Sequence, residues 1–125
     1  PLHASRRRTH YMVVKGSIVL VNFPFTDLSQ TKLRPAIILW VDPAGNDVIV
    51  CAITSQKTDQ IFDGELLLDS TDPEFPKTGL RVTSKARITR IATLNRQLVV
   101  RKLGDLSEQH YQQLNALMIQ AFQLA

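Results

Sequence analysis

The sequence predicts a small, strongly bent antiparallel sheet closed by a C-terminal helix, within a chain of 125 residues. About five to seven short runs rich in β-branched and aromatic residues alternate with turn-forming residues. One long segment with helical spacing of its apolar residues follows them at the C-terminal end. So many short strands in so short a chain indicate a compact barrel.

The strand signals come in chain order. Residues 17–25 form the first run, and Pro24 near its end indicates an edge or a bend. The almost entirely apolar run 36–41 predicts a strand buried on both faces, and residues 47–54 pair with it as an antiparallel hairpin. Shorter strands are expected at residues 64–68, 80–83, 87–91 and 98–103, with loops at residues 26–33 and 69–79.

One helix is expected, over residues 107–124. Its N-terminus is capped either by Ser107 or by a capping box of Asp105 and Glu108. One face is apolar and is expected to dock on the sheet, and glutamines occupy the opposite face. The apolar positions are Tyr111, Leu114, Leu117, Met118, Ala121 and Phe122.

Composition excludes several classes of protein. A single cysteine allows no internal disulfide, and three widely spaced histidines allow no closed zinc site. No apolar run approaches the ~20 residues of a membrane helix, so a cytoplasmic protein without membrane association is expected. No cofactor is expected either, because the chain has no phosphate-binding loop, nucleophile elbow or dinucleotide fingerprint.

The net charge of +4 is concentrated at the N-terminus. Residues 1–11 contain Arg6, Arg7 and Arg8 and no acid, and we interpret them as a leader or a variable arm. The single domain is then residues 12–125, where 12 basic residues face 11 acidic ones. A basic surface on this domain must come from the placement of charge.

Arg34 is the first candidate for chemistry. The following Pro35 restricts Arg34 to extended geometry where a buried strand begins, so its guanidinium is held at a rim where it can reach a phosphate. The alternative is an ordinary strand-start arginine paired with a carboxylate such as Asp27.

Three polar residues end the neighbouring strand. Thr54, Ser55 and Gln56 follow an apolar run directly, and such a polar lip can hold an anion, although serine and threonine also begin many turns. Because both segments belong to one hairpin, we expect Arg34 and Thr54 at the same end of the sheet.

Residues 85–91 alternate in character. Strand periodicity places Lys85, Arg87 and Thr89 on one face and Arg90 on the other. A cationic strand face can follow an RNA backbone, although a solvated face is the commoner explanation.

Three further residues are assigned structural places. Cys51 lies within a strand and is expected to be an inert core thiol. Trp40, in the most apolar run, is expected in the core, and His110 is expected on the surface of the helix.

The blocks G-S-I-V-L-V (16–21), P-F-T-D (24–27), L-R-P-A-I-I-L (33–39) and A-I-T-S-Q (52–56) together closely resemble the MazF/PemK-type toxins of bacterial type II toxin–antitoxin modules. Weaker similarity continues through R-I-A-T-L (90–94) and L-V-V-R-K-L-G (98–104).

This resemblance implies an SH3-like barrel of the MazF/PemK/CcdB type and a homodimer that an antitoxin neutralises. It further implies a sequence-specific, ribosome-independent endoribonuclease that cleaves single-stranded RNA without a metal. By motif, Arg34 and Thr54 match the catalytic arginine and threonine of the family. The residues matching RNA-binding positions are Gln30, Ser55, Gln56, Arg87 and Thr89.

One departure from the family pattern supports a second hypothesis. Some members carry an aspartate where Thr89 aligns, so a carboxylate base is missing here. The alternative function is a non-catalytic binding protein of the same fold, like a gyrase poison or an inactive relative.

Overall fold

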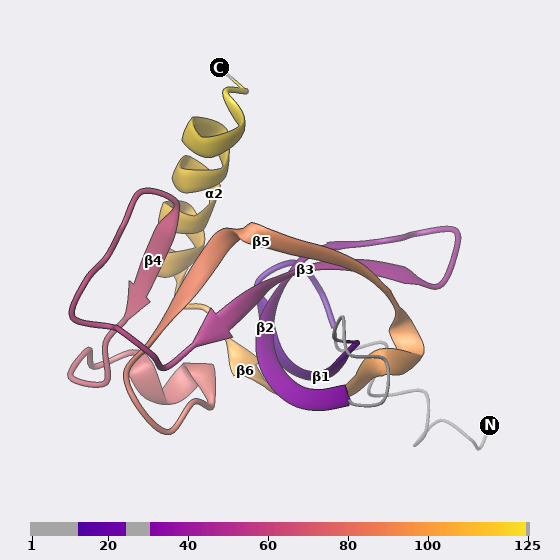
Figure 1. Ribbon diagram of the computed structural model, residues 1–125, viewed down its shortest axis with the longest axis horizontal. Helices are drawn as coiled ribbons and strands as arrows, with labels where there is room; N and C mark the ends of the chain where they lie inside the picture. The colour runs from indigo at the N-terminus through magenta and orange to yellow at the C-terminus, as the bar shows by residue number, and fades with distance from the viewer. Residues whose placement is uncertain (1–12, 25–30, 125) are drawn as a thin grey trace.

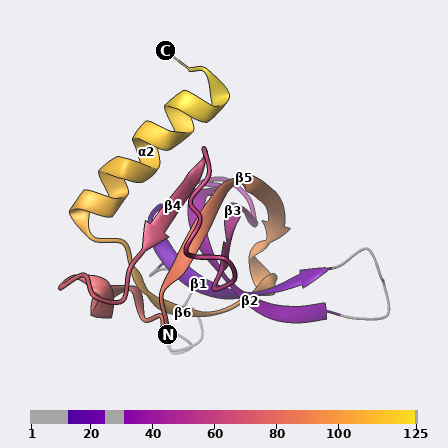
Figure 2. The ribbon, with the colours of Figure 1, turned by 60° about the vertical axis from the view of Figure 1, so that its left-hand side comes forward.

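The computed structural model describes residues 13–24 and 31–124. Within them, six strands form one antiparallel sheet in the order β4-β5-β3-β2-β1-β6, and the sheet curls strongly on itself (Figure 1). The helix α2 (Glu108–Phe122) lies outside the curled sheet (Figure 2). The strands are β1 (Ser17–Pro24), β2 (Thr31–Val41), β3 (Asp47–Thr54), β4 (Glu65–Leu68), β5 (Ser84–Asn95) and β6 (Val99–Asp105).

The predicted bent sheet with a C-terminal helix is therefore confirmed. The hairpin of β2 and β3 is also confirmed, although β2 begins at Thr31, inside the expected loop. Residues 80–83 are not a strand, and β5 is much longer than the expected 87–91. Two short 3-10 helices, η1 (Phe75–Thr78) and η2 (Arg96–Leu98), lie in the connections.

Apolar side chains pack on both faces of the sheet. One core cluster lies on the concave face and includes Val19, Val21, Ile38 and Val50. The other lies between the sheet and α2 and includes Ile37, Ile53, Ile88 and Leu114. Since successive strand residues point to opposite faces, a central strand needs apolar residues at nearly every position, as in the run 36–39.

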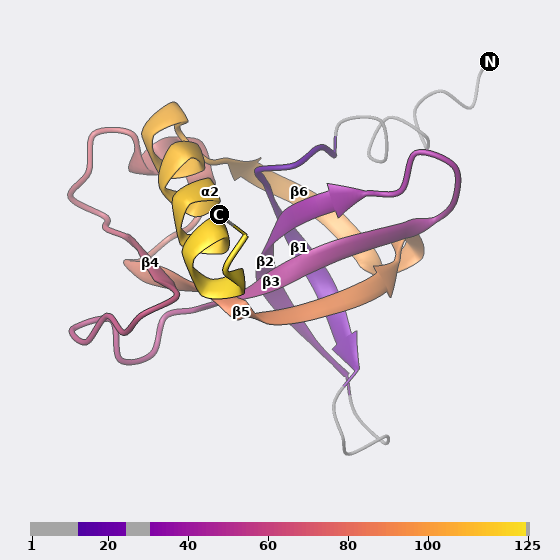
Figure 3. The same ribbon diagram turned by 90° about the horizontal axis from the view of Figure 1, so that it is seen from above.

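The N-terminus of α2 is set by one of the two capping alternatives that the sequence offers. The Ser107 Oγ accepts a hydrogen bond from the His110 N–H at 3.1 Å, so Ser107 is the cap and Asp105 remains in β6. Leu114 is fully buried, and Tyr111, Leu117 and Met118 pack partly against the core. Figure 3 shows the helix lying over one side of the curled sheet, and Figure 1 shows its C-terminal end extending away from the strands. Phe122 is accordingly exposed, so the expected apolar stripe docks only in part.

An irregularity in β5 changes which residues share a face. Cys51 pairs with Ile91 but the next residue, Ala52, pairs with Arg87, so β5 carries three extra residues between these pairs. The Ile88 N–H donates to the Gly64 carbonyl at 2.8 Å within this bulge. Simple alternation therefore fails beyond Ile88.

Two structural assignments are wrong. Trp40 is 44% exposed, and a register shift after Ile38 places it opposite Ile49. His110 is buried beneath the helix, with Nε2 3.6 Å from the Asp72 carboxylate. The assignment of Cys51 is confirmed: it is fully buried, and burial raises the pKa of its thiol to about 12.

No helix in the described ranges is both long and apolar enough to cross a membrane. The arm of residues 1–11 lies outside the described residues.

Candidate functional site

The fold brings Arg34 and Thr54 together at one end of the hairpin, as expected. The β2–β3 ladder reaches Ala36 opposite Ala52, and continuing the same register places Arg34 opposite Thr54. Pro35 has no N–H to donate, and before it β2 pairs only with β1, where Arg34 lies opposite Val21. The two strands therefore part at Pro35, and a hollow opens on the concave face.

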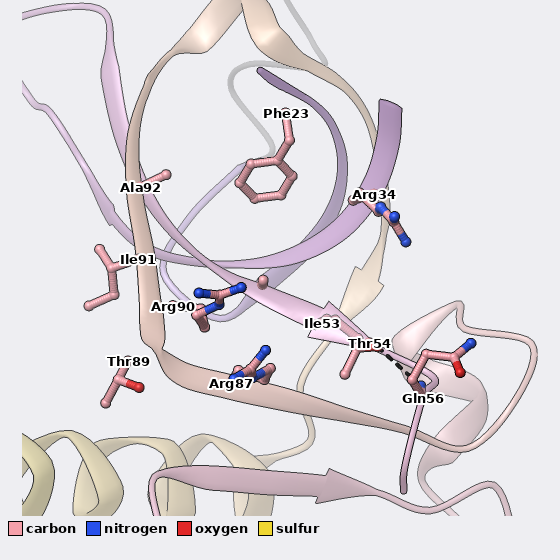
Figure 4. A pocket seen from close by; sticks show the side chains of 11 residues that line it. Phe23, Arg34, Ile53, Thr54, Gln56, Arg87, Thr89, Arg90, Ile91 and Ala92 are labelled. Carbon is pink, nitrogen blue, oxygen red and sulfur yellow. Dashed lines mark hydrogen bonds between the residues drawn. The ribbon is translucent and has the colours of Figure 1, made fainter. Parts of the chain in front are cut away.

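This hollow is a cavity of about 580 Å³ between β1, β2, β3 and β5 (Figure 4). Phe23, Ala52 and Ala92 contribute apolar surface to its wall. The guanidinium groups of Arg34, Arg87 and Arg90 also line it (Figure 4). The lining residues are Phe23, Arg34, Ala52, Ile53, Thr54, Gln56, Arg87, Thr89, Arg90, Ile91 and Ala92.

A smaller cavity of about 200 Å³ adjoins the first one. Arg34, Ile53, Thr54 and Gln56 line both cavities and therefore mark the junction between them. The far wall of the smaller cavity is the irregular segment before β5. The remaining lining residues are Pro35, Ser55, Leu80, Arg81, Val82 and Ser84.

The charged side chains that the described residues contribute to these two cavities are all arginines. Four arginines line them, namely Arg34, Arg81, Arg87 and Arg90, and no carboxylate of the described residues does. The near-neutral domain thus acquires a strongly basic surface by placement alone. Such a surface attracts and holds a phosphate backbone.

A buried carboxylate behind this surface holds two of the cations of β5. Glu65 Oε1 lies 2.9 Å from Lys85 Nζ, and Oε2 lies 3.6 Å from Arg87 Nε. Lys85 is 5% exposed and also donates to the Gln60 carbonyl at 2.9 Å, so it does not belong to a solvated strand face. Arg87, by contrast, keeps 42% of its side chain exposed toward the cavity.

The contacts of Glu65 keep it ionised. Burial by itself would raise its pKa, but the Phe62 N–H, Lys85 and Arg87 together stabilise the carboxylate and lower the pKa below its usual value. The carboxylate therefore neutralises part of the charge behind the cavity wall without entering the cavity.

The polar lip after β3 is a tight turn. The Gln56 N–H donates to Thr54 Oγ1 at 3.1 Å, which fixes the threonine hydroxyl at the junction of the cavities (dashed line in Figure 4). Thr54 is half-buried and Gln56 is exposed, and Ser55 lines only the smaller cavity. Gln30 and Asp27, the proposed partner of Arg34, lie outside the described residues.

The bulge in β5 exchanges the places expected for Thr89 and Arg90. Figure 4 shows the Arg90 guanidinium on the same side of β5 as Arg87, whereas Thr89 and Ile91 lie on the other side of the strand. The sequence pattern placed Thr89 with Arg87 and Arg90 opposite them. Thr89 is therefore a rim residue, and Arg90 takes the inner position.

Sequence reasoning missed three residues of the site. Phe23 looked like an ordinary strand aromatic, and Arg90 was assigned to the wrong face. Arg81 was not considered, since nothing but its charge distinguishes it in a segment expected to be a strand.

Comparisons with known proteins agree with this architecture. Residues 14–122 match the family described as PemK-like, MazF-like toxin of type II toxin–antitoxin system. No curated protein sequence matches the chain significantly.

Solved structures share the fold over nearly the whole chain. An endoribonuclease in complex with its cognate antitoxin, from a mycobacterial species, is 15% identical with a TM-score of 0.69, over 90% of this chain and 96% of that one. The toxin MazF-mt6 of Mycobacterium tuberculosis is 22% identical with a TM-score of 0.67, over 86% and 96% of the two chains. MazF from a MazE–MazF crystal of Deinococcus radiodurans is 16% identical with a TM-score of 0.67, over 90% and 97%.

The family match covers most of the chain, and the curled six-stranded sheet with its C-terminal helix is the MazF-like fold. The protein therefore belongs to the PemK-like, MazF-like toxins of type II toxin–antitoxin systems.

Proposed function

We propose that this protein is an endoribonuclease that cleaves single-stranded RNA in the cytoplasm, at specific sequences and without ribosome or metal. One observation carries the proposal: Arg34 and Thr54 both line each of two adjoining cavities, whose walls also carry Arg81, Arg87 and Arg90. Single-stranded RNA suits such a site because its phosphates can bind the arginines and its unstacked bases can contact the apolar surface of the larger cavity.

The proposed reaction is an internal displacement at phosphorus. The ribose 2′-oxygen attacks the adjacent phosphorus and loses its proton, and the bond from phosphorus to the 5′-oxygen breaks. The products are a 2′,3′-cyclic phosphate and a 5′-hydroxyl, whose oxygen gains a proton. Negative charge grows on the non-bridging oxygens during the attack, and donors already aimed at that charge lower the barrier most.

Arg34 and Thr54 are the proposed catalytic residues. The Arg34 guanidinium stays protonated and presents a fork of donors to the phosphate oxygens. The Thr54 hydroxyl, held by the turn at Gln56, holds a second oxygen. We assign RNA binding to Ser55, Gln56, Arg87 and Thr89, and to Gln30 beyond the described residues.

The test uses purified protein, a long RNA and excess EDTA. Discrete fragments with 5′-hydroxyl ends are expected, and Arg34→Ala should slow their formation about 100-fold or more, since one lost oxyanion donor costs that much. Arg101→Ala on β6 is the control, because this exposed arginine lines neither cavity and should cleave at the wild-type rate.

A non-catalytic binding protein of the same fold is the second candidate. The cavities contain no described carboxylate to act as a general base, and this observation favours the alternative. Intact RNA in the same assay, with DNA gyrase stalled by the protein, would select it.

We propose two protein partners. Two structures of relatives hold an antitoxin, and an acidic segment of a cognate antitoxin would complement the four arginines of the cavities. A second copy of the chain would cover the apolar surface around Trp40, Ile49 and Ile91. Pairing across β3 puts these three on the face that carries α2, and Trp40 and Ile91 are both more than two fifths exposed.

A further inference from the structure

The smaller cavity contains a cation to which the proposed reaction gives no role. Arg81 lies on its far wall, in the segment between η1 and β5, and is exposed. No carboxylate of the described residues lies within ion-pair distance of it, whereas Arg87 has Glu65 behind it. Arg81 thus contributes a positive charge to the lining of this cavity that no described carboxylate offsets.

The segment that carries Arg81 is irregular but held at both ends. At its start, the buried Thr78 hydroxyl donates to the Phe75 carbonyl at 2.7 Å and accepts from the Leu80 N–H at 3.1 Å. At its end, the Thr83 hydroxyl accepts from the Ser70 N–H at 2.9 Å. A side chain on such a fixed backbone can select one position of a ligand.

The position of the cavity indicates the ligand. Arg34 and Thr54 stand between the two cavities, with Arg87 and Arg90 on one side and Arg81 on the other. An RNA strand whose reacting phosphate lies on Arg34 must leave the junction in two directions. Its next phosphates then pass Arg87 and Arg90 on one side and Arg81 on the other.

We propose that Arg81 binds one backbone phosphate of the RNA next to the cleaved linkage, on the side opposite Arg87 and Arg90. This inference rests on the proposed function and extends it: the site reads a strand through two cavities, and Arg81 determines how much RNA beyond the reacting phosphate is needed. A charge-assisted contact to one phosphate is typically worth about a tenfold change in affinity.

The experiment measures binding and cleavage separately. A single-stranded oligonucleotide is made with 2′-deoxyribose in place of the attacking ribose, so that it binds but cannot react; it contains the mapped cleavage sequence, or, where no cleavage is detected, a mixed sequence with 2′-deoxyribose throughout. A second series carries one neutral methylphosphonate at each flanking linkage in turn. Wild type, Arg81→Met and the control Arg101→Met are compared by fluorescence anisotropy, and their cleavage of the all-ribose RNA is timed.

Arg81→Met should weaken binding of the fully charged RNA about tenfold, with an unchanged thermal midpoint, and Arg101→Met should not. A methylphosphonate at one flanking linkage should weaken wild-type binding about as much as Arg81→Met weakens binding of the fully charged RNA. Wild type and Arg81→Met should bind this modified RNA with the same affinity. Equal binding of the charged RNA by wild type and Arg81→Met, or the same loss at every methylphosphonate position, would overturn the inference.

The two proposals fail differently in this experiment. If wild type binds the RNA with the expected Arg81 dependence but does not cleave it, the nuclease proposal fails and the Arg81 site stands. If wild type cleaves normally and Arg81→Met binds as tightly, only the Arg81 site fails. Absence of RNA binding by the wild type would exclude both.

Discussion

Glu65 is the residue on which the basic wall of the site depends. Its carboxylate contacts Lys85, Arg87 and the Phe62 N–H, and its side chain is only 8% exposed. Lys85 in turn lies 5.4 Å over the Phe62 ring and binds the Gln60 carbonyl, so the loop between β3 and β4 is fastened to β5 through this pair. Removal of the carboxylate would leave Lys85 as a buried cation without its anion.

Glu65→Gln should therefore lower the free energy of unfolding at pH 7 by about 2 kcal/mol, because hydrogen bonds to charged groups are worth that much. Urea unfolding monitored by Trp40 fluorescence measures this change. Glu74→Gln is the matched control, since Glu74 makes an exposed pair with Lys77 at 3.6 Å and should cost far less. Equal small losses in both variants would contradict a role for the buried pair.

The same carboxylate predicts a dependence on pH. Its pKa is lower in the folded protein than in the unfolded chain, so its contribution is complete above the unfolded pKa and is lost as the pH falls through the folded value. Wild type should lose stability as the pH drops below about 4.3, the ordinary value for a glutamate. The free energy of unfolding should depend less steeply on pH in this range for Glu65→Gln than for wild type. Identical slopes of the two proteins, measured by urea unfolding from pH 6 to pH 3, would be evidence against this role of Glu65.

At the scale of elements, the wall of the smaller cavity depends on a close contact between η1 and β6. Gly79 ends η1 with a φ of +72°, and a Cβ there would lie 2.0 Å from the Leu103 carbonyl oxygen. Backbone atoms form this obstacle, so no side chain can move to relieve it.

Gly79→Ala should consequently lower the free energy of unfolding by more than about 1 kcal/mol. That figure is the largest change typical of a glycine-to-alanine substitution at a position whose backbone alanine can adopt. Gly45→Ala is the control: its φ is not in the left-handed region, and the added Cβ would meet only the Asp42 carboxylate, a side-chain group that can rotate away, rather than backbone. Thermal unfolding of both variants measures the difference. A midpoint for Gly79→Ala as high as that of Gly45→Ala would refute the close contact.

The elements also show where sequence patterns are sufficient. β1 and β3 follow from β-branched runs and α2 from helical spacing, because each keeps a regular period along its length. β5 does not, because its three extra residues shift the period in mid-strand. The same shift moved Arg90 inward and Thr89 outward, so the prediction for these two residues failed at the bulge.

On the scale of the whole molecule, the exposed apolar residues of the α2 face predict self-association. Wild type should elute as a dimer in size-exclusion chromatography with light scattering, and Trp40→Glu should be monomeric, since a two-fold contact would bring two like charges together. Val100→Glu on β6 is the control, because Val100 is equally exposed at 44% but lies on another strand. A monomeric wild type, or a dimeric Trp40→Glu variant, would exclude this face as the interface.

The sequence alone determined the class of fold, the hairpin and the location of Arg34 and Thr54 at the same end of it. These follow from local periodicity and from antiparallel pairing, in which residues equally distant from a turn come together. The tertiary structure alone decided which cations face the cavities. Glu65 withdraws Lys85 from solvent, a bulge turns Arg90 inward, and the close contact at Gly79 presents Arg81. Each of these depends on contacts between segments far apart along the chain, which no local pattern encodes.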